Sequence, residues 1–149
     1  VGIEIAEARD RSKIFILSGG GPHSWRTIYT DGREHPSADD YDPSYFGHSI
    51  GHWEGDTLVV DSIHFNERFW FARRPTGMVH TDALHLIERI SRPDYDTLHY
   101  EVTIDDPKAY TRPWTASWNI PWANEDIEEY FCQDYNIDVE HIVGPGGVE

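Results

Sequence analysis

The chain has 149 residues, a length that fits one domain around a single hydrophobic core. Hydrophobic residues make up 38% of it, which argues against long disorder, and no apolar run approaches the roughly 20 residues that a membrane helix needs. The formal net charge of −15 excludes nucleic acid as an expected partner, because phosphate binding needs a surface rich in Lys and Arg; a neutral or cationic ligand, or a metal, suits this field better.

Short strands separated by turn-forming residues fill the chain. The segments Arg9-Asp10-Arg11-Ser12 and Pro93-Asp94-Tyr95-Asp96 are suited to hairpin loops, and Asp31-Gly32 is a strong hairpin-turn signal. We expect strands at 3–8, 13–18, 25–30, 48–53, 57–65, 84–91, 97–104, 115–120 and 127–132.

Regular spacing and local connections predict an antiparallel meander. Such a chain is all-β and forms a single up-and-down β-barrel of the lipocalin kind, with a β-sandwich as the alternative. Neither a repeat nor a linker divides the sequence, so we expect one domain over 1–149, ending in a tail at 136–149. Because the chain starts at Val1, we expect a processed or trimmed piece.

The segment from Gly51 to Asp61 predicts a hairpin and offers the first candidate site. If Gly55-Asp56 is a two-residue loop, His48, His52 and Asp61 share one largely apolar face, which we expect to point into the barrel. A carboxylate bonded to one imidazole nitrogen leaves the other nitrogen as a base. A three-residue loop would instead move Asp61 to the opposite face.

The hairpin at 84–104 offers a second set of polar groups. With a four-residue loop, His85, Arg89 and Tyr100 point inward beside apolar residues, while Glu88 faces solvent. A buried Arg or His must be paired, so this set either binds a polar ligand atom or forms a structural salt bridge, for which Asp61 is a candidate partner.

The corner at 103–114 is rich in polar and aromatic residues. Tyr110 and Trp114 are candidates to line the mouth of the barrel, and Asp105 and Asp106 are candidates to cap a turn or to pair with cationic neighbours. The alternative is a corner stabilised by its own ion pairs.

No cofactor motif is present, so we expect no organic cofactor. The nine histidines leave a transition-metal site, assembled from several strands, as an alternative. His80 and His85 are five residues apart, which fits neither a zinc helix nor a strand site, and His48 and His52 are four apart but on an expected strand, where one metal would not readily span them. The single cysteine, Cys132, excludes an intramolecular disulfide and is interpreted as a small core residue.

Four blocks of the sequence resemble a group of bacterial proteins mostly labelled hypothetical. They are a D-G-R-x-H-P turn, a G-H-W-E-G-D-T-L-V-V-D hairpin, an A-L-H-L-I-E-R strand and a T-I-D-D-P-K-A-Y-T-R-P-W corner, found here at 31–36, 51–61, 83–89 and 103–114. The resemblance implies no activity and no catalytic residue, and it favours export to the periplasm or outside the cell. The hairpin also looks like those of lipocalin-type (calycin) barrels.

Three classes of function follow from these residues. The first is a barrel enzyme without organic cofactor, of the lyase, isomerase or cyclase type, in which His48, His52 or His85 moves a proton from a small, partly apolar substrate. Asp61 would orient the base, and Arg89 or Tyr100 would hold an oxyanion.

The second class is a barrel that binds a small ligand without catalysis. The third is carbohydrate binding through Trp114, Trp118 and Trp122, which recur every fourth residue, or a metal-dependent protein. The expected partner is thus a small molecule, and a homodimer through 66–81 is a further expectation.

Overall fold

The computed structural model describes residues 2–19, 24–69, 71 and 78–128. Within these residues it contains one 3-10 helix, η1 (Arg9–Arg11). No helix among the described residues is long and apolar enough to cross a membrane. The strands are β1 (Ile3–Ala8), β2 (Lys13–Ser18), β3 (Ser24–Tyr29), β4 (His48–Glu54), β5 (Thr57–Ile63), β6 (His85–Asp94), β7 (Thr97–Asp105) and β8 (Trp114–Pro121).

Each strand expected between residues 3 and 120 is present, so the alternation of apolar and polar residues predicted the elements correctly. The strand expected at 127–132 falls mostly outside the described residues, and Ile127 and Glu128 are not in a strand. Also outside the described residues are Cys132, the tail at 136–149, and positions 70 and 72–77 of the segment expected to dimerise.

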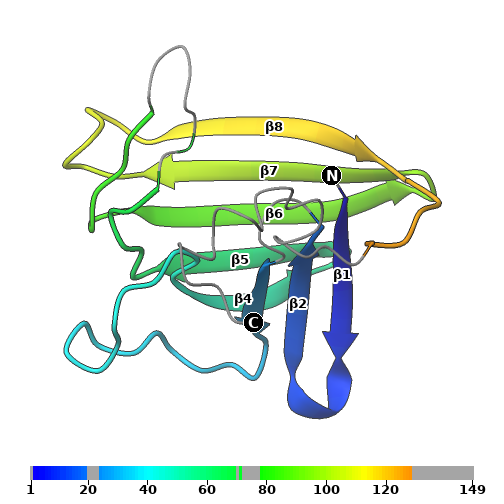
Figure 1. Ribbon diagram of the computed structural model, residues 1–149, viewed down its shortest axis with the longest axis horizontal. Helices are drawn as coiled ribbons and strands as arrows, with labels where there is room; N and C mark the ends of the chain where they lie inside the picture. Colours follow the sequence, from blue (N-terminus) through cyan, green and yellow to red (C-terminus); the bar gives the residue numbers. More distant parts are fainter. Residues whose placement is uncertain (1, 20–23, 70, 72–77, 129–149) are drawn as a thin grey trace, which may run out of the picture.

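The eight strands form one sheet in chain order, curled into a half-barrel (Figure 1). β1 and β8 are its two edges, and β1 to β3 run across the direction of β4 to β8. The all-β prediction is confirmed, and a single sheet takes the place of the two packed sheets of the β-sandwich alternative.

One connection departs from the expected meander. β3 and β4 pair in parallel, through Ile28 with Ser49 and Tyr29 with Ile50. Parallel neighbours need a crossover, because the chain must return to the end at which the first strand began. The hairpin expected at Asp31-Gly32 is therefore wrong: Gly32 has a φ of +78°, but the turn opens the 30–47 crossover loop.

The β4–β5 hairpin has the register expected for a two-residue loop. Glu54 pairs with Thr57, and Gly55 supplies the positive φ of +60° that such a turn requires. His52 therefore lies opposite Val59, and Ile50 lies opposite Asp61.

The β6–β7 hairpin differs by one residue from the expected register. Asp94 pairs with Thr97, and a bulge lies between Ser91 and Asp94. Pro93 occupies this bulge, where its missing N–H removes no ladder hydrogen bond. The bulge turns every residue before it to the other face, so the inward orientation expected for His85 and Arg89 is wrong.

The core lies against the inner face of the half-barrel. Glu88 and Tyr100, from β6 and β7, belong to this face. Two buried apolar clusters form it: Ile14, Ile28, Leu58, Val60 and Ile90 in one, and Phe65, Leu84, Leu86, Val102 and Ile104 in the other. The face of β4 and β5 that carries His52 and Asp61 is the outer one, contrary to expectation.

Candidate functional site

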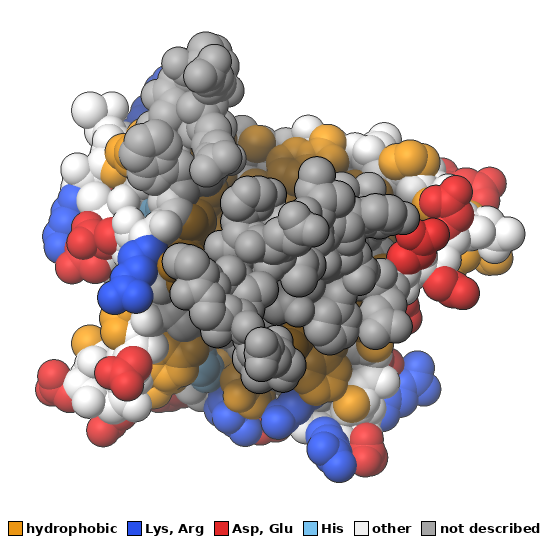
Figure 2. Space-filling model, viewed as in Figure 1, with side chains coloured by type: hydrophobic (Ala, Val, Ile, Leu, Met, Phe, Trp, Pro, Cys, Tyr) orange, Lys and Arg blue, Asp and Glu red, His pale blue; other side chains and the backbone are white. Residues whose placement is uncertain are grey.

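Two adjoining cavities lie on the inner face. They measure about 310 Å³ and about 250 Å³ and share Ile5, Ile90 and Leu98 in their walls. The larger volume lies at the lower end of the range of small-molecule sites, and the smaller one lies just below it. Figure 2 shows hydrophobic side chains between the centre and the edge of one face of the molecule, with charged side chains at its periphery.

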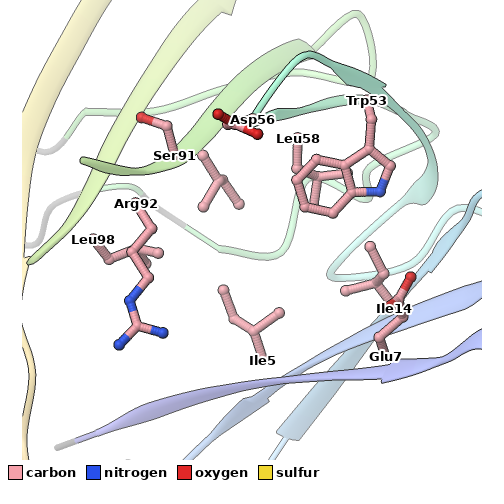
Figure 3. A pocket seen from close by; sticks show the side chains of 10 residues that line it. Ile5, Glu7, Ile14, Trp53, Asp56, Leu58, Ser91, Arg92 and Leu98 are labelled. Carbon is pink, nitrogen blue, oxygen red and sulfur yellow. The ribbon is translucent and has the colours of Figure 1, made fainter. Parts of the chain in front are cut away.

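The smaller cavity has both apolar and charged residues in its lining. Ile5 lies on the β1 side, and Leu58 and Trp53 lie across from it (Figure 3). Glu7 and Arg92 contribute charged groups to the lining.

The larger cavity ends at a polar cluster. Apart from this cluster, its lining is apolar: Ile3, Ile5, Ile16, Ile90, Leu98, Trp118 and Ile120. The cluster consists of Arg26 from β3, Glu88 from β6 and Tyr100 from β7, all of which line the cavity. Trp118 packs on Tyr100 with ring centroids 4.8 Å apart, which makes one wall aromatic.

Arg26 and Glu88 form a two-pronged ion pair across the half-barrel. Arg26 Nη1 donates to Glu88 Oε1 at 2.9 Å, and Arg26 Nη2 bonds to Glu88 Oε2. The Glu88 side chain is 2% exposed and the Arg26 side chain 13%. A carboxylate this deeply buried needs such a partner, because its charge would otherwise be uncompensated.

The remaining bonds of the cluster fix its geometry. Arg26 Nε donates to Ser49 Oγ at 3.0 Å, and Arg26 Nη2 donates to Ser62 Oγ at 3.2 Å. The two serine hydroxyls lie 2.9 Å apart. The Tyr100 hydroxyl donates to Glu88 Oε1 at 2.5 Å, and burial, followed by the charge of Glu88, raises the pKa of Tyr100.

The cluster has hydrogen-bonding capacity left for a ligand. A guanidinium carries five N–H donors, and the bonds described above use four of those on Arg26. The Tyr100 hydroxyl uses its proton on Glu88 and keeps its oxygen lone pairs. The end of the cavity can therefore both donate to and accept from one polar group.

A second polar group, the histidine network, lies on the outer face below the 30–47 loop. Asp61 Oδ1 accepts from His35 Nε2 at 3.1 Å and from His85 Nε2 at 2.9 Å. His35 Nδ1 lies 2.8 Å from His48 Nδ1. His64 Nε2 donates to the carbonyl oxygen of Pro36, also in the loop, at 2.9 Å.

The structure brings three of the four candidate catalytic residues together. His48, Asp61 and His85 belong to the histidine network, whereas His52 is exposed and lies 3.3 Å from Glu54. His48 is buried, and desolvation, followed by the nearby charges of His35, Arg33 and His64, lowers its pKa.

The four candidate binding residues lie in three separate places. Arg89 is on the outer face, where its guanidinium donates to Glu54 at 2.7 Å, while Tyr100 lies at the inner cluster. Tyr110 and Trp114 pack edge to face, 5.8 Å apart, beside the second apolar cluster. The Tyr110 hydroxyl donates to the carbonyl oxygen of Val79, and neither residue lines the two cavities.

The corner after β7 is organised by one buried carboxylate. Asp106 accepts hydrogen bonds from Thr81, Lys108 and Ala109, so it caps the turn as expected. Lys108 Nζ pairs with Asp82 at 2.5 Å rather than with the aspartates beside it.

Sequence reasoning missed Arg26 and Glu88 as a pair and His35 as a network member. Glu88 lies two residues after Leu86 and two before Ile90, so all three side chains share one face of the strand. If the two aliphatic residues are buried, Glu88 is buried with them. Nothing local connects it to Arg26, 62 residues earlier in the chain.

Within the described residues, no group of three or more His, Cys, Asp or Glu side chains is arranged so that it could hold a metal ion. Comparisons of the chain with models of protein families, with curated proteins and with solved structures found no match.

Proposed function

We propose that this protein binds a small, uncharged, largely apolar molecule in the inner cavities. The observation that carries the proposal is the combination of an apolar wall with one polar end, where Arg26, Glu88 and Tyr100 are held by their mutual bonds. Sites for small molecules have this composition: apolar walls and a few fixed polar groups that set orientation.

The charge of the cluster favours a neutral ligand. Arg26 is already neutralised by Glu88, and the raised pKa of Tyr100 keeps its hydroxyl protonated near neutral pH. An anionic ligand would meet the Glu88 carboxylate and the net charge of −15. A hydroxyl group fits best, because it can donate to the Tyr100 oxygen and accept from Arg26.

Three probes of one shape test this proposal: naphthalene, 2-naphthol and 2-naphthoate. We expect 2-naphthol to bind more tightly than naphthalene, and 2-naphthoate to bind most weakly, in titrations followed by calorimetry or fluorescence. Equal affinities, or a preference for the anion, would contradict the proposed polar end. Absence of binding by all three would contradict the cavity itself.

Matched variants locate the binding site. Leu98→Trp fills both cavities from β7 and is expected to abolish binding, whereas Thr103→Trp, on the outer face of the same strand, is expected to retain it. Tyr100→Phe removes the hydroxyl alone, so 2-naphthol keeps the bond from Arg26 and its affinity is expected to fall toward that of naphthalene.

Proton transfer at the histidine network is a second candidate function. The Asp61–His85 bond orients an imidazole whose side chain is 40% exposed, and a proton on Nε2 leaves Nδ1 as a base. The assay is deuterium exchange next to the carbonyl of a small ketone, followed by NMR. Catalysed exchange that is lost in His85→Gln and kept in His52→Gln would support this function, and equal rates in both variants would contradict it.

A further inference from the structure

The polar end of the cavity and the histidine network lie on opposite faces of the same two strands, β4 and β5. His48 and Ser49 are consecutive on β4, and Asp61 and Ser62 are consecutive on β5. Consecutive strand residues point to opposite faces. Ser49 and Ser62 therefore bind Arg26 on the inner face, while His48 and Asp61 bind His35 on the outer face.

The bond between His35 and His48 depends on protonation. With His35 Nε2–H donated to Asp61, a neutral His35 keeps Nδ1 as an acceptor for the His48 Nδ1–H. When both rings are protonated, each presents an N–H at Nδ1, and a separation of 2.8 Å cannot hold two facing protons. Protonation of both rings therefore breaks this contact, whereas a single added proton leaves an N–H to bridge the two nitrogens.

Burial and the charges around His48 oppose its protonation. His48 faces Tyr29 from β3, His35 and Tyr41 from the loop, and His64 after β5. The other charged groups nearby are Arg33, paired with Asp31, Lys13 over the Tyr29 ring, and His85, with Asp105 opposite it in the register. Asp61 is thus the one carboxylate bonded directly to these imidazoles among the described residues, and it is shared by two of them.

The 30–47 loop determines how β3 is held against β4. Only two residue pairs join these strands, and the part of the connecting loop next to β3 is attached through His35 to Asp61 and through Pro36 to His64. The far part of the loop is held by backbone bonds of Ser44 with His64 and Asn66, which do not titrate. β3 carries Arg26, whose bonds to Ser49 and Ser62 cross this junction.

We propose that the histidine network is a pH-sensitive switch for the ligand cavity: protonation breaks the His35–His48 contact, loosens the loop and the β3–β4 junction, and moves Arg26 from the polar end. This inference rests on the proposed binding function. The switch weakens binding in acid, below the ordinary pKa of an imidazole, because both rings must be protonated and burial lowers the pKa of His48.

The test compares the affinity for 2-naphthol, which is uncharged throughout, at about pH 7.5 and about pH 5.5. We expect the wild type to lose affinity about tenfold in acid, within the range of typical coupling between sites. His35→Gln is expected to keep its affinity, because the amide can donate to Asp61 and accept from His48 without titrating. His52→Gln, an exposed histidine of the same strand outside the network, is expected to behave as the wild type. Equal loss in wild type and His35→Gln, or no loss in either, would overturn the switch.

A second measurement separates the switch from the binding function. Amide hydrogen exchange of residues 31–47, followed by NMR at both pH values, needs no ligand. After correction for intrinsic exchange, we expect protection to fall in acid in the wild type and to persist in His35→Gln. If 2-naphthol binds at neither pH while protection falls as expected, the binding function fails and the switch of the loop stands. Protection that does not change with pH overturns the switch whether or not the probe binds.

Discussion

The Tyr100 hydroxyl donates a 2.5 Å hydrogen bond to Glu88 Oε1 along a diagonal of the β6–β7 pair, since the residue directly opposite Glu88 is Val102. Diagonal neighbours on one face of an antiparallel pair lie within reach of an aromatic side chain. The bond ties the two strands that form the cavity wall to Arg26 on β3, which approaches Glu88 from the other side of the half-barrel. One buried carboxylate thus connects both halves of the curled sheet.

Removing this carboxylate should strongly destabilise the protein. Glu88→Leu leaves the Arg26 guanidinium buried without its counter-charge, and breaking a buried pair from one side costs about 3–5 kcal/mol. The free energy of unfolding in urea, followed by tryptophan fluorescence, measures the loss. The double variant Arg26→Met/Glu88→Leu should recover much of it, because no unpaired charge then remains. A double variant no more stable than Glu88→Leu would contradict the ion pair as the cause.

The raised pKa of Tyr100 predicts a loss of stability in alkali. A phenol whose pKa is raised by folding from its ordinary value of 10.0 holds its proton more tightly in the folded chain, so its contribution is complete below pH 10.0 and is lost as the pH rises further. The stability gap between wild type and Tyr100→Phe should narrow above that pH, by up to about 1.4 kcal/mol per pH unit. If the difference in unfolding free energy between the two proteins stays constant with pH, folding does not raise the pKa of the Tyr100 phenol.

The β4–β5 register could be predicted because its two-residue loop is marked by Gly55-Asp56 and leaves the ladder regular. The β6–β7 register could not, because the bulge at Pro93 adds a residue to one strand only. Alternation identified two faces on β6 but did not decide between them. Ile87 lies between His85 and Arg89, just as Glu88 lies between Leu86 and Ile90, so each face mixes apolar and charged residues.

Predicting which residues meet at the candidate sites required the three-dimensional fold, because the positions of the strands alone did not determine it. The sequence places Asp61, His48 and His85 on their strands, but the face that carries them is the outer one and not the predicted inner one. His35 reaches Asp61 only because the crossover loop returns over the outer face, and the parallel pairing that requires this loop has no local signal. Arg26 meets Glu88 only when the sheet curls.

The Asp106 carboxylate is expected to stabilise the corner between β7 and β8 through its hydrogen bonds, and replacing one of its oxygens tests this. Asp106 is buried and accepts from the backbone N–H of Thr81, Lys108 and Ala109. Asp106→Asn turns one acceptor into a donor that faces N–H groups, which should lower the free energy of unfolding by about 1–3 kcal/mol. Asp105→Asn, the half-buried neighbour, should change it by no more than about 0.5 kcal/mol. Similar losses in both variants would argue against the capping role.

Two glycines with nearly equal positive φ values separate conformational strain from crowding at the loop end. Gly47 and Gly55 have φ values of +62° and +60°, so alanine meets a similar backbone penalty of about 1 kcal/mol at either position. A Cβ at Gly47 would lie 2.3 Å from the Ile63 carbonyl oxygen, whereas nothing lies within 4 Å of one at Gly55. Gly47→Ala must therefore displace the loop end from β5, and it should cost about 1–3 kcal/mol more than Gly55→Ala in urea unfolding.

Because Gly47 precedes His48, the same variant should also reduce the amide protection of residues 31–47 at neutral pH, while Gly55→Ala leaves it unchanged. Equal stabilities of the two variants would mean that the loop end is not packed against β5 as described.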